Sequence, residues 1–256
     1  MKITFLGTGY AAATEERDNT YLLIGDDDDN KIGTIMVDVG GSPLSKLKKE
    51  KVDLHSIKYL IFTHFHIDHI YGLPSLLWGM WLEGRKDELI IYCEQDNEKK
   101  LRDWLNVLEV NNWSLKFNIV IQTFHHKSKN RLFTLGSMTI STIPAKHAIP
   151  TVGIELKKGD KICVYSSDTE PNEWIKDYER IDLLIHECTM AIGQTPFHTS
   201  LKYFLEYYNL HSINKIVFVH LSDQENYQSV METHVSKEEQ DKMKFASDLM
   251  TVSFDK

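Results

Sequence analysis

The chain has 256 residues, of which 42% are hydrophobic, so it can bury a sizeable core without disulfides or metals to hold the fold together. Its 37 acidic and 29 basic residues give a net charge of −8, whereas a protein that grips a long nucleic acid usually presents a basic face. The three cysteines, Cys93, Cys163 and Cys188, are odd in number and widely spaced, which argues against a disulfide framework and for a reducing compartment.

The N-terminal part of the chain predicts strands separated by turns. Residues 2–9 are apolar and alternating before they become glycine-rich, so they predict a strand and a turn rather than a signal peptide. Residues 20–25 and 33–41 predict two further strands. The acidic run between them, DDDD at 26–29, is more typical of a solvated hairpin turn than of a calcium loop. No apolar stretch approaches membrane-spanning length, so we expect a cytoplasmic protein with no membrane partner.

The rest of the chain first carries strands in runs and then alternates strands with helices. The expected elements are a helix at 42–52, a strand at 57–66, a helix at 68–84, a strand at 89–93, a helix at 97–108, strands near 116–124, 131–145, 151–159 and 161–168, a helix at 171–181, a strand at 182–188, a helix at 199–210, and strands at 215–223 and 248–254. No repeat or low-complexity linker divides them, so we expect one domain over residues 1–256. This order suits an α/β protein with two packed sheets and helices outside them.

The segment THFHIDH at residues 63–69 crowds metal-binding side chains together. His64, His66, Asp68 and His69 are all suitable ligands for a borderline metal such as zinc. The buried strand before them ends at His64, and a rigid strand end can hold ligands over a crevice. Because side chains alternate along an extended backbone, His64 and His66 point the same way. Asp68 and His69 follow as the chain turns, so they can face a second metal.

Three later residues stand at the ends of predicted strands, where they can complete such a site. They are His147, Asp168 and His220. Each alone would fit a structural role, but together with the first cluster they supply the number of ligands that two metals require. Five other histidines lack such a setting, and we interpret them as surface or core residues: His55, His125, His126, His211 and His234.

Two other motifs do not carry the function that they suggest. GTGYAA at residues 7–12 matches a dinucleotide fingerprint, but that fingerprint must open a helix, and here a strand follows soon afterwards. HECTM at residues 186–190 begins like a zinc-binding HExxH motif but lacks the second histidine.

The histidine cluster in its context resembles the metallo-β-lactamase fold. THFHIDHIYGLPSLL looks like the HxHxDH signature of that fold, with the glycine–leucine continuation typical of its phosphodiesterase branch. The resemblance extends over nearly the whole chain, because FLGTG, RDNTYLLI, VDVGG, KHAIPTVGIEL, VYSSDTEP, LLIHECT, FHTS and FVHLSD follow in the family's order. HECT and HTS are similar to the paired HEAT and HST motifs of the tRNA 3′-processing endonuclease, ribonuclease Z. The resemblance implies an αββα sandwich of two mixed sheets, with two metals at one edge.

The same resemblance implies a role for each residue of the site. It assigns one zinc to His64, His66 and His147 and the other to Asp68, His69 and His220, with Asp168 as the bridge, and manganese is a possible replacement. A hydroxide between the metals would be the nucleophile, and Asp68 would orient it. His198, oriented and kept protonated by Glu187, would give a proton to the leaving alkoxide.

The resemblance covers enzymes that act on precursor tRNA and others that act on small phosphodiesters. Many tRNA enzymes insert a long arm between the equivalents of His147 and Asp168, but only 20 residues separate these two positions here. Asp223 and Gln224 also follow HLS where the tRNA enzymes usually carry an arginine. The compact chain resembles cyclic-nucleotide phosphodiesterases, including the phage-type anti-Pycsar proteins. We therefore expect the protein to hydrolyse 3′,5′-cyclic nucleotides to mononucleotides and so to counter cyclic-nucleotide immune signalling. If a phage encodes the protein, it would act in the host cytoplasm.

Two alternatives stay open beside this expectation. One is ribonuclease Z activity, in which case tRNA would be the partner instead of a small cyclic nucleotide. The other is a non-catalytic zinc-binding protein, although the seven ligands and the His198–Glu187 pair argue against an inactive site. The segment 73–84 carries Trp78, Met80 and Trp81, which fit either core packing or a homodimer interface.

Overall fold

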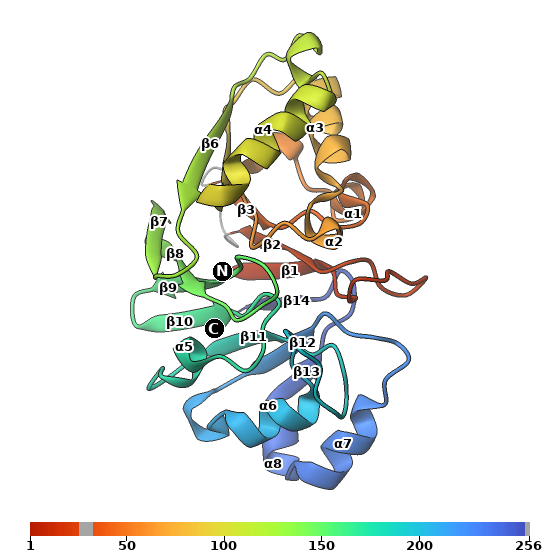
Figure 1. The fold of residues 1–256 in the computed structure, drawn as a ribbon, viewed down its shortest axis with the longest axis vertical. Helices are drawn as coiled ribbons and strands as arrows, with labels where there is room; N and C mark the ends of the chain where they lie inside the picture. Colours follow the sequence, from red (N-terminus) through yellow and green to blue (C-terminus); the bar gives the residue numbers. More distant parts are fainter. Residues whose placement is uncertain (26–32, 254–256) are drawn as a thin grey trace.

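Two mixed β-sheets packed face to face form the centre of the computed structural model, which describes residues 1–25 and 33–253 (Figure 1). The first sheet contains, in spatial order, β14 (Thr251–Ser253), β1 (Lys2–Gly7), β2 (Tyr21–Gly25), β3 (Thr34–Val37), β4 (Ile57–Ile61), β5 (Leu89–Glu94) and β6 (Ile119–Phe124). The second contains β13 (Met243–Phe245), β12 (Ile216–Val219), β11 (Leu183–Glu187), β10 (Lys161–Tyr165), β9 (Val152–Lys158), β8 (Met138–Pro144) and β7 (Asn130–Leu135). The acidic run at 26–29 lies outside the described residues, so the turn expected there stays a prediction.

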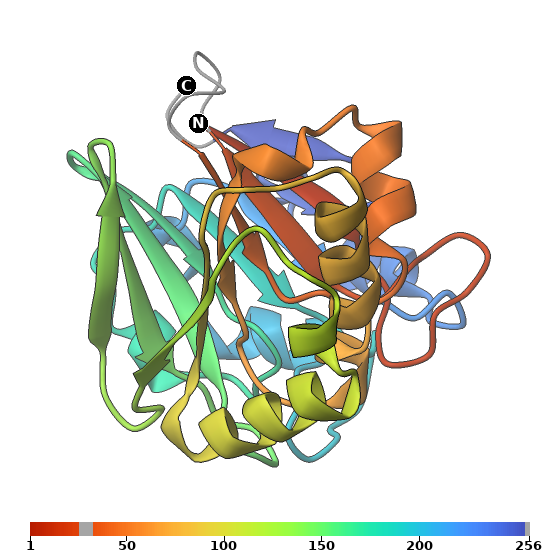
Figure 2. The same cartoon turned by 90° about the horizontal axis from the view of Figure 1, so that it is seen from above.

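Helices cover the outer face of each sheet. The first sheet carries α1 (Pro43–Lys49), α2 (Ile67–Ile70), α3 (Leu73–Leu82) and α4 (Glu98–Val107), and the second carries α5 (Glu173–Lys176), α6 (Leu201–Tyr207), α7 (Tyr227–His234) and α8 (Lys237–Gln240). Seen from above in Figure 2, α1, α3 and α4 lie in front of the strands of the first sheet. The expected αββα arrangement is therefore confirmed.

Three apolar clusters hold these four layers together. Along β1, Ile3 and Phe5 point into the core between the sheets, whereas Leu6 packs under the helices of the first sheet. On the other side, Phe204 of α6 and Phe218 of β12 pack in the layer outside the second sheet. Each such side chain contributes about 1.5–3 kcal/mol when it is fully removed from water. Strands buried on both faces explain why the sequence carries continuous apolar runs instead of a strict alternation.

Parallel pairing brings several strand ends to one edge of each sheet. In the second sheet, β10, β11 and β12 are parallel neighbours, and in the first sheet β3 is parallel to β4. Because parallel strands end at the same edge, the residues after them meet there. This places Asp168, Glu187 and His220 in one row and Asp38 beside His64.

Some elements differ from the predictions. The helix expected at 68–84 is two helices, because the Gly72 backbone packs against β3: its N–H donates to the Val39 carbonyl at 2.8 Å, and a Cβ there would lie 2.6 Å from the same oxygen. The strand expected at 131–145 is the hairpin of β7 and β8, which turns at Gly136 with a φ of 58°. None of the elements predicted from the sequence corresponds to α7, α8 or β13.

The state of the cysteines and the length of the helices bear on two of the expectations drawn from the sequence. All three cysteines are buried and free, which confirms the absence of a disulfide framework. None of the helices within residues 1–25 and 33–253 has the length and apolarity needed to cross a bilayer.

Candidate metal centre

Seven side chains form two adjoining clusters that share one carboxylate. The first cluster contains His64, His66, His147 and Asp168, and the second contains Asp68, His69, Asp168 and His220. Within each cluster, one atom from every residue lies within 4.8 Å of the others. All seven residues that the sequence pointed to are therefore brought together, although their roles as ligands stay predictions.

The distances between these atoms fit metal coordination. The Nδ1 of His66 lies 3.1 Å from the Nε2 of His64 and 3.0 Å from the Nε2 of His147. The Oδ2 of Asp168 lies 3.3 Å from the Nε2 of His220 and 3.4 Å from the Nε2 of His69. Tetrahedral bonds of about 2.0–2.1 Å would place ligand atoms roughly 3.3 Å apart. The clusters thus have the size of zinc sites.

Hydrogen bonds to residues outside the two clusters fix the orientation of the His64 and His69 rings. The buried carboxylate of Asp38 accepts from the backbone N–H and the hydroxyl of Thr63, each at 2.8 Å, and from the Nδ1 of His69 at 2.8 Å. Since the Thr63 hydroxyl donates to Asp38, its oxygen accepts from the Nδ1 of His64 at 3.0 Å. Each neutral imidazole therefore keeps its proton on Nδ1 and offers Nε2 to a metal. Although burial alone would lower the pKa of His69, the charges of Asp168 and Asp38 raise it, so a metal at its Nε2 would displace a proton.

The rings of His147 and His220 are fixed in the same way. His147 donates from Nδ1 to the backbone carbonyl of Phe197 at 2.8 Å. The hydroxyl of Thr189 donates to Glu187 at 2.9 Å and accepts from the Nδ1 of His220, also at 2.9 Å. Asp38, Thr63 and Thr189 are functional residues that the sequence analysis missed, because only their contacts with the histidines distinguish them from ordinary buried residues.

Unpaired buried atoms test whether the residues fit a metal. Among the described residues, four buried side-chain nitrogen or oxygen atoms have no hydrogen-bond partner: His69 Nε2, His220 Nε2, Asp168 Oδ1 and Ser167 Oγ. Three of the four belong to the second cluster. Orphaned polar atoms are rare because they lose hydration without compensation, and a bound cation would satisfy these three. The donor set therefore fits divalent metal ions.

The charges of the centre favour cations as well. Burial lowers the pKa of His64, His66 and His147, which keeps their imidazoles in the neutral form that binds metals. Although burial alone would raise the pKa of Asp168, the charges of His220 and His69 hold it well below its usual range. The Asp168 carboxylate, which the two clusters share, is therefore ionised.

Glu187 and His198 form a hydrogen-bonded pair beside the clusters. The Nδ1 of His198 donates to Glu187 Oε1 at 2.9 Å, and Glu187 is almost fully buried. Burial alone would lower the pKa of His198, but the hydrogen bond and charge of Glu187 raise it above its ordinary value. The ring of His198 stacks on His220 at 5.4 Å between centroids and lies 4.9 Å from His147, so it reaches both clusters.

Backbone strain gathers around the centre. Asp38, Ser167, Phe197 and His220 all have a left-handed backbone, with φ values of 60°, 55°, 72° and 57°. Residues other than glycine adopt this conformation at a cost in free energy, and such outliers cluster at functional sites. Ser167 and His220 turn the chain directly before or at a predicted ligand, so the strain positions these side chains.

The other features singled out in the sequence lie outside the centre. No cluster of ligand atoms within residues 1–25 and 33–253 includes His55, His125, His126, His211 or His234. The glycine-rich segment after β1 opens the loop 8–20 and no helix, as expected. His186 is buried, its Nδ1 donates to the carbonyl of Glu187 at 2.7 Å, and its Nε2 accepts from the hydroxyl of Tyr208 at 3.0 Å, so it has a structural role.

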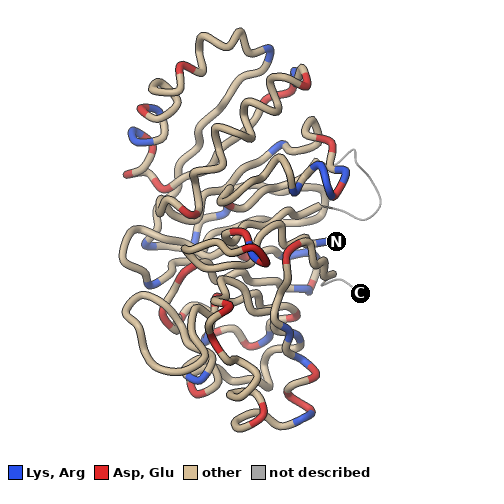
Figure 3. The backbone as a smooth tube through the Cα atoms, turned by 90° about the vertical axis from the view of Figure 1, so that its right-hand side faces the viewer, with Lys and Arg blue, Asp and Glu red and all other residues tan. Residues whose placement is uncertain are grey.

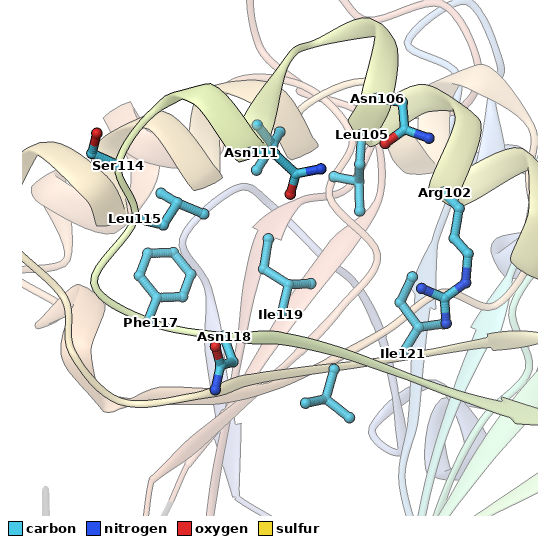
Figure 4. A pocket seen from close by; sticks show the side chains of 12 residues that line it. Arg102, Leu105, Asn106, Asn111, Ser114, Leu115, Phe117, Asn118, Ile119 and Ile121 are labelled. Atoms are coloured by element: carbon cyan, nitrogen blue, oxygen red, sulfur yellow. The ribbon is translucent and has the colours of Figure 1, made fainter.

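Two pockets differ in their relation to the centre. One of about 750 Å³ lies between α4 and β6, where Leu105, Phe117 and Ile119 form an apolar floor (Figure 4), and it shares no lining residue with the clusters. Another of about 410 Å³ adjoins the centre, since Lys146 and Glu170 line it and flank His147 and Asp168 in the sequence. Of these two pockets, only the second is lined by residues next to the clusters in the sequence.

Comparisons with known proteins identify relatives of the chain. The sequence model of a family described as anti-Pycsar protein Apyc1 matches residues 1–250. Ribonuclease Z of Pyrococcus horikoshii is 30% identical over 188 residues, which make up 70% of this chain but only 57% of that protein. The structure of the short form of human tRNase Z, ELAC1, has a TM-score of 0.79 at 22% identity and covers 99% of both chains. The metallo-beta-lactamase fold protein YhfI of Bacillus subtilis has a TM-score of 0.78 at 18% identity and covers 98% of this chain and 99% of its own.

Proposed function

The chain belongs to the family of the anti-Pycsar protein Apyc1, and from this premise we propose that it is a metal-dependent phosphodiesterase that hydrolyses 3′,5′-cyclic nucleotides to mononucleotides. The observation that carries the proposal is the pair of metal-binding clusters joined by Asp168, with the His198–Glu187 pair beside them. A cyclic phosphodiester needs both parts, because its phosphate is charged and its leaving group is an alkoxide. The metallo-β-lactamase fold and the ribonuclease Z-like relatives support the same reaction class.

Divalent ions bound to the clusters would supply Lewis-acid polarisation of the phosphate and activate water as the nucleophile. Asp68 lies at the N-terminus of α2 with a pKa held low, against the effect of its burial, by His220 and His69. Its ionised carboxylate can orient the attacking water. As water adds to phosphorus and releases one proton to solvent, the P–O3′ bond would break and the electron pair would leave with O3′.

His198 is placed to give the leaving oxygen its proton. Because Glu187 accepts from its Nδ1, the proton on Nε2 is the one that faces the centre. A ring that bears a raised pKa and touches both clusters can donate as the P–O3′ bond breaks. The product is a mononucleotide that keeps its phosphate on the 5′ oxygen.

The size of the chain supports a small substrate. The 20 residues between His147 and Asp168 are largely used by β9 and β10, so no arm for gripping a tRNA extends from this position. Along the backbone drawn in Figure 3, positions of Lys and Arg are interspersed with positions of Asp and Glu, and the net charge of the chain is −8. Ribonuclease Z activity is the second candidate, favoured by the relatives of that name.

A head-to-head assay separates these functions. Metal-loaded protein is incubated with cyclic AMP, cyclic GMP, a cyclic dinucleotide and a precursor tRNA, and the products are resolved by chromatography. The proposal predicts 5′-mononucleotides from the cyclic mononucleotides. Cleavage of the tRNA alone would establish the second candidate, and metal binding without turnover of any substrate would favour a non-catalytic zinc-binding protein. Elemental analysis of the same protein distinguishes zinc from manganese.

We also propose a homodimer that uses the surface around α3. Trp78 and Leu82 are 43% and 66% exposed, and the Trp78 ring lies 4.7 Å from Trp81 and 4.9 Å from Trp113 between centroids. Met80, in contrast, is fully buried in the core. Exposed aromatic clusters are typical of protein interfaces. Light scattering that gives the mass of a monomer would refute this proposal.

A further inference from the structure

Phe197 combines exposure with backbone strain directly beside the metal centre. Its side chain is 44% exposed, although its backbone has a φ of 72°. A bulky residue adopts this left-handed conformation only where its surroundings enforce it. A single exposed apolar residue needs no explanation in general, but one that is held under strain next to a predicted catalytic histidine does.

Two hydrogen bonds enforce this conformation. The backbone N–H of Phe197 donates to Glu170 Oε1 at 3.1 Å, and its carbonyl accepts from the Nδ1 of His147 at 2.8 Å. The carboxylate of Glu170 also holds Lys146 by an ion pair of 2.6 Å. The backbone of Phe197 is thus held at its N–H by Glu170 and at its carbonyl by His147. These two contacts determine where the ring lies.

The loop that carries Phe197 is fixed at both ends. At its start, the N–H of Ala191 donates to Glu225 Oε2 at 2.7 Å, and at its end the N–H of Leu201 donates to the carbonyl of Met190 at 2.8 Å. The loop therefore presents the ring from a defined frame. The Phe197 ring centroid lies 6.3 Å from that of His147, with the two planes at 86°, so the ring forms part of the rim of the centre.

The pocket of about 410 Å³ begins at the same place. Lys146, Glu170, Tyr203 and Tyr207 line it, and Glu170 joins it to the backbone of Phe197. Phe197, whose ring is partly exposed and whose backbone contacts Glu170, therefore lies next to a polar pocket that offers an ammonium, a carboxylate and two phenols. This combination matches a nucleobase, which has an apolar face and hydrogen-bonding edges.

We propose that Phe197 is the residue on which the base of a bound nucleotide stacks, with the edge of the base directed to the pocket of Lys146, Tyr203 and Tyr207. This inference rests on the proposed function, because a phosphate held at the clusters places the base one sugar away, at the rim. Stacking tolerates every base, so Phe197 supplies affinity for nucleosides in general. The polar groups of the pocket then determine which base is preferred.

Binding of two matched probes tests this role without turnover. AMP and ribose 5-phosphate both carry the phosphate and the sugar, and only AMP has a base. We expect metal-loaded wild-type protein to bind AMP more tightly than ribose 5-phosphate in calorimetric titrations. Phe197→Ala should weaken the binding of AMP by about 5- to 100-fold, the usual contribution of an aromatic ring stacked on a base. Its affinity for ribose 5-phosphate should change by less than about twofold.

Further variants separate stacking from support of the fold. Phe197→Tyr keeps an aromatic face and should retain AMP affinity, whereas Phe197→Asn accepts the left-handed backbone without a ring and should behave as Phe197→Ala does. Val107→Ala removes an apolar side chain that is 80% exposed at the end of α4, away from the clusters, and should leave both affinities unchanged. Elemental analysis should find the same metal content in every variant.

Three results would overturn the inference. They are equal losses for both probes, which would mean that Phe197 acts only by supporting His147; an unchanged affinity of Phe197→Ala for AMP; and a wild type that does not prefer AMP. Failure of the proposed function has a different signature, namely no hydrolysis of cyclic nucleotides by a wild-type protein that still distinguishes the two probes.

Discussion

Removing the imidazole of His198 tests the proposed proton transfer most directly. Neither of the two clusters that share Asp168 includes His198, so His198→Ala should keep its metals. Loss of a general acid typically slows a reaction by about 10²–10⁴-fold, which corresponds to about 2.7–5.4 kcal/mol in the activation free energy. We expect kcat for cyclic AMP to fall by this factor while KM changes little.

The leaving group reveals whether the lost contribution is a proton. The leaving group of cyclic AMP is an alkoxide, which needs protonation, whereas bis(p-nitrophenyl) phosphate releases a stabilised phenolate that does not. His198→Ala should therefore lose far less activity on the second substrate. The assay compares initial rates of wild type and variant on both substrates, with metal content measured on the same samples.

Glu187→Gln provides a second route to the same step. Glu187 Oε1 accepts from His198 and from the backbone N–H groups of Thr169 and Thr199, and Oε2 accepts from the N–H and the hydroxyl of Thr189. A glutamine amide costs least if its NH₂ replaces Oε2, because the Thr189 hydroxyl can then accept from it as well as from His220, although the N–H and the O–H of Thr189 both lose their acceptor. The free energy of unfolding should fall by about 1–3 kcal/mol for each orphaned donor. The rate on cyclic AMP should approach that of His198→Ala.

One pattern of rates would refute the reasoning. If His198→Ala loses the same factor on both substrates with its metals in place, the imidazole does not act as a proton donor to the leaving group. Full activity of the variant on cyclic AMP would refute the assignment as well.

Three further predictions concern metal binding by Asp168, the tight backbone packing at Gly40 and the dependence of stability on pH. Asp168→Ala should lower metal affinity by more than about 100-fold, as measured by competition with a chelating dye. This loss exceeds the 10- to 100-fold that is usual when a residue that hydrogen-bonds to a ligand is removed. Retention of two equivalents of metal would contradict the bridging role. Gly40→Ala would place its Cβ 2.1 Å from the carbonyl oxygen of Asp68, so we expect about 1–3 kcal/mol lower stability and weaker metal binding, whereas Gly84→Ala, with nothing within 4 Å, should leave metal binding intact. Burial lowers the pKa of His186 from 6.5 to about 4, so the unfolded chain binds the proton first and stability is lost as the pH falls from about 6.5 to 4. Between pH 7 and 4.5 this amounts to roughly 2–3 kcal/mol, and chemical denaturation of chelator-treated His186→Gln should show a correspondingly smaller loss than wild type.

The sequence singled out the residues of the two clusters because their positions follow from local patterns. His64, Asp168 and His220 each come at the end of an apolar run, and the ends of parallel strands meet at one edge whatever the loops do. The same argument could not find Asp38 or Thr189. Each is a small polar residue after a strand, and its function lies in the hydrogen bond that it makes to a histidine far away in the chain.

Local patterns also failed where the tertiary structure overrides them. The apolar run of residues 68–84 reads as one helix, but the close approach of Gly72 to Val39 ends α2 and starts α3 anew. The left-handed backbone of Phe197 is set by Glu170 and His147, neither of which is its neighbour in the sequence. Such contacts are decided by the assembled fold, so a single sequence does not display them.

The shared centre also constrains when the protein can acquire its metals. Its side chains come from both halves of the chain, and they span the positions from His64 to His220. A nascent chain of 150 residues would expose the HxHxDH segment and His147 but neither Asp168 nor His220. Because metal binding adds directly to the free energy of folding only when the full ligand set is assembled, both sheets must be synthesised and docked first. We therefore expect the complete centre to bind its metals only after both halves have folded, and bound metals would then hold the two halves together.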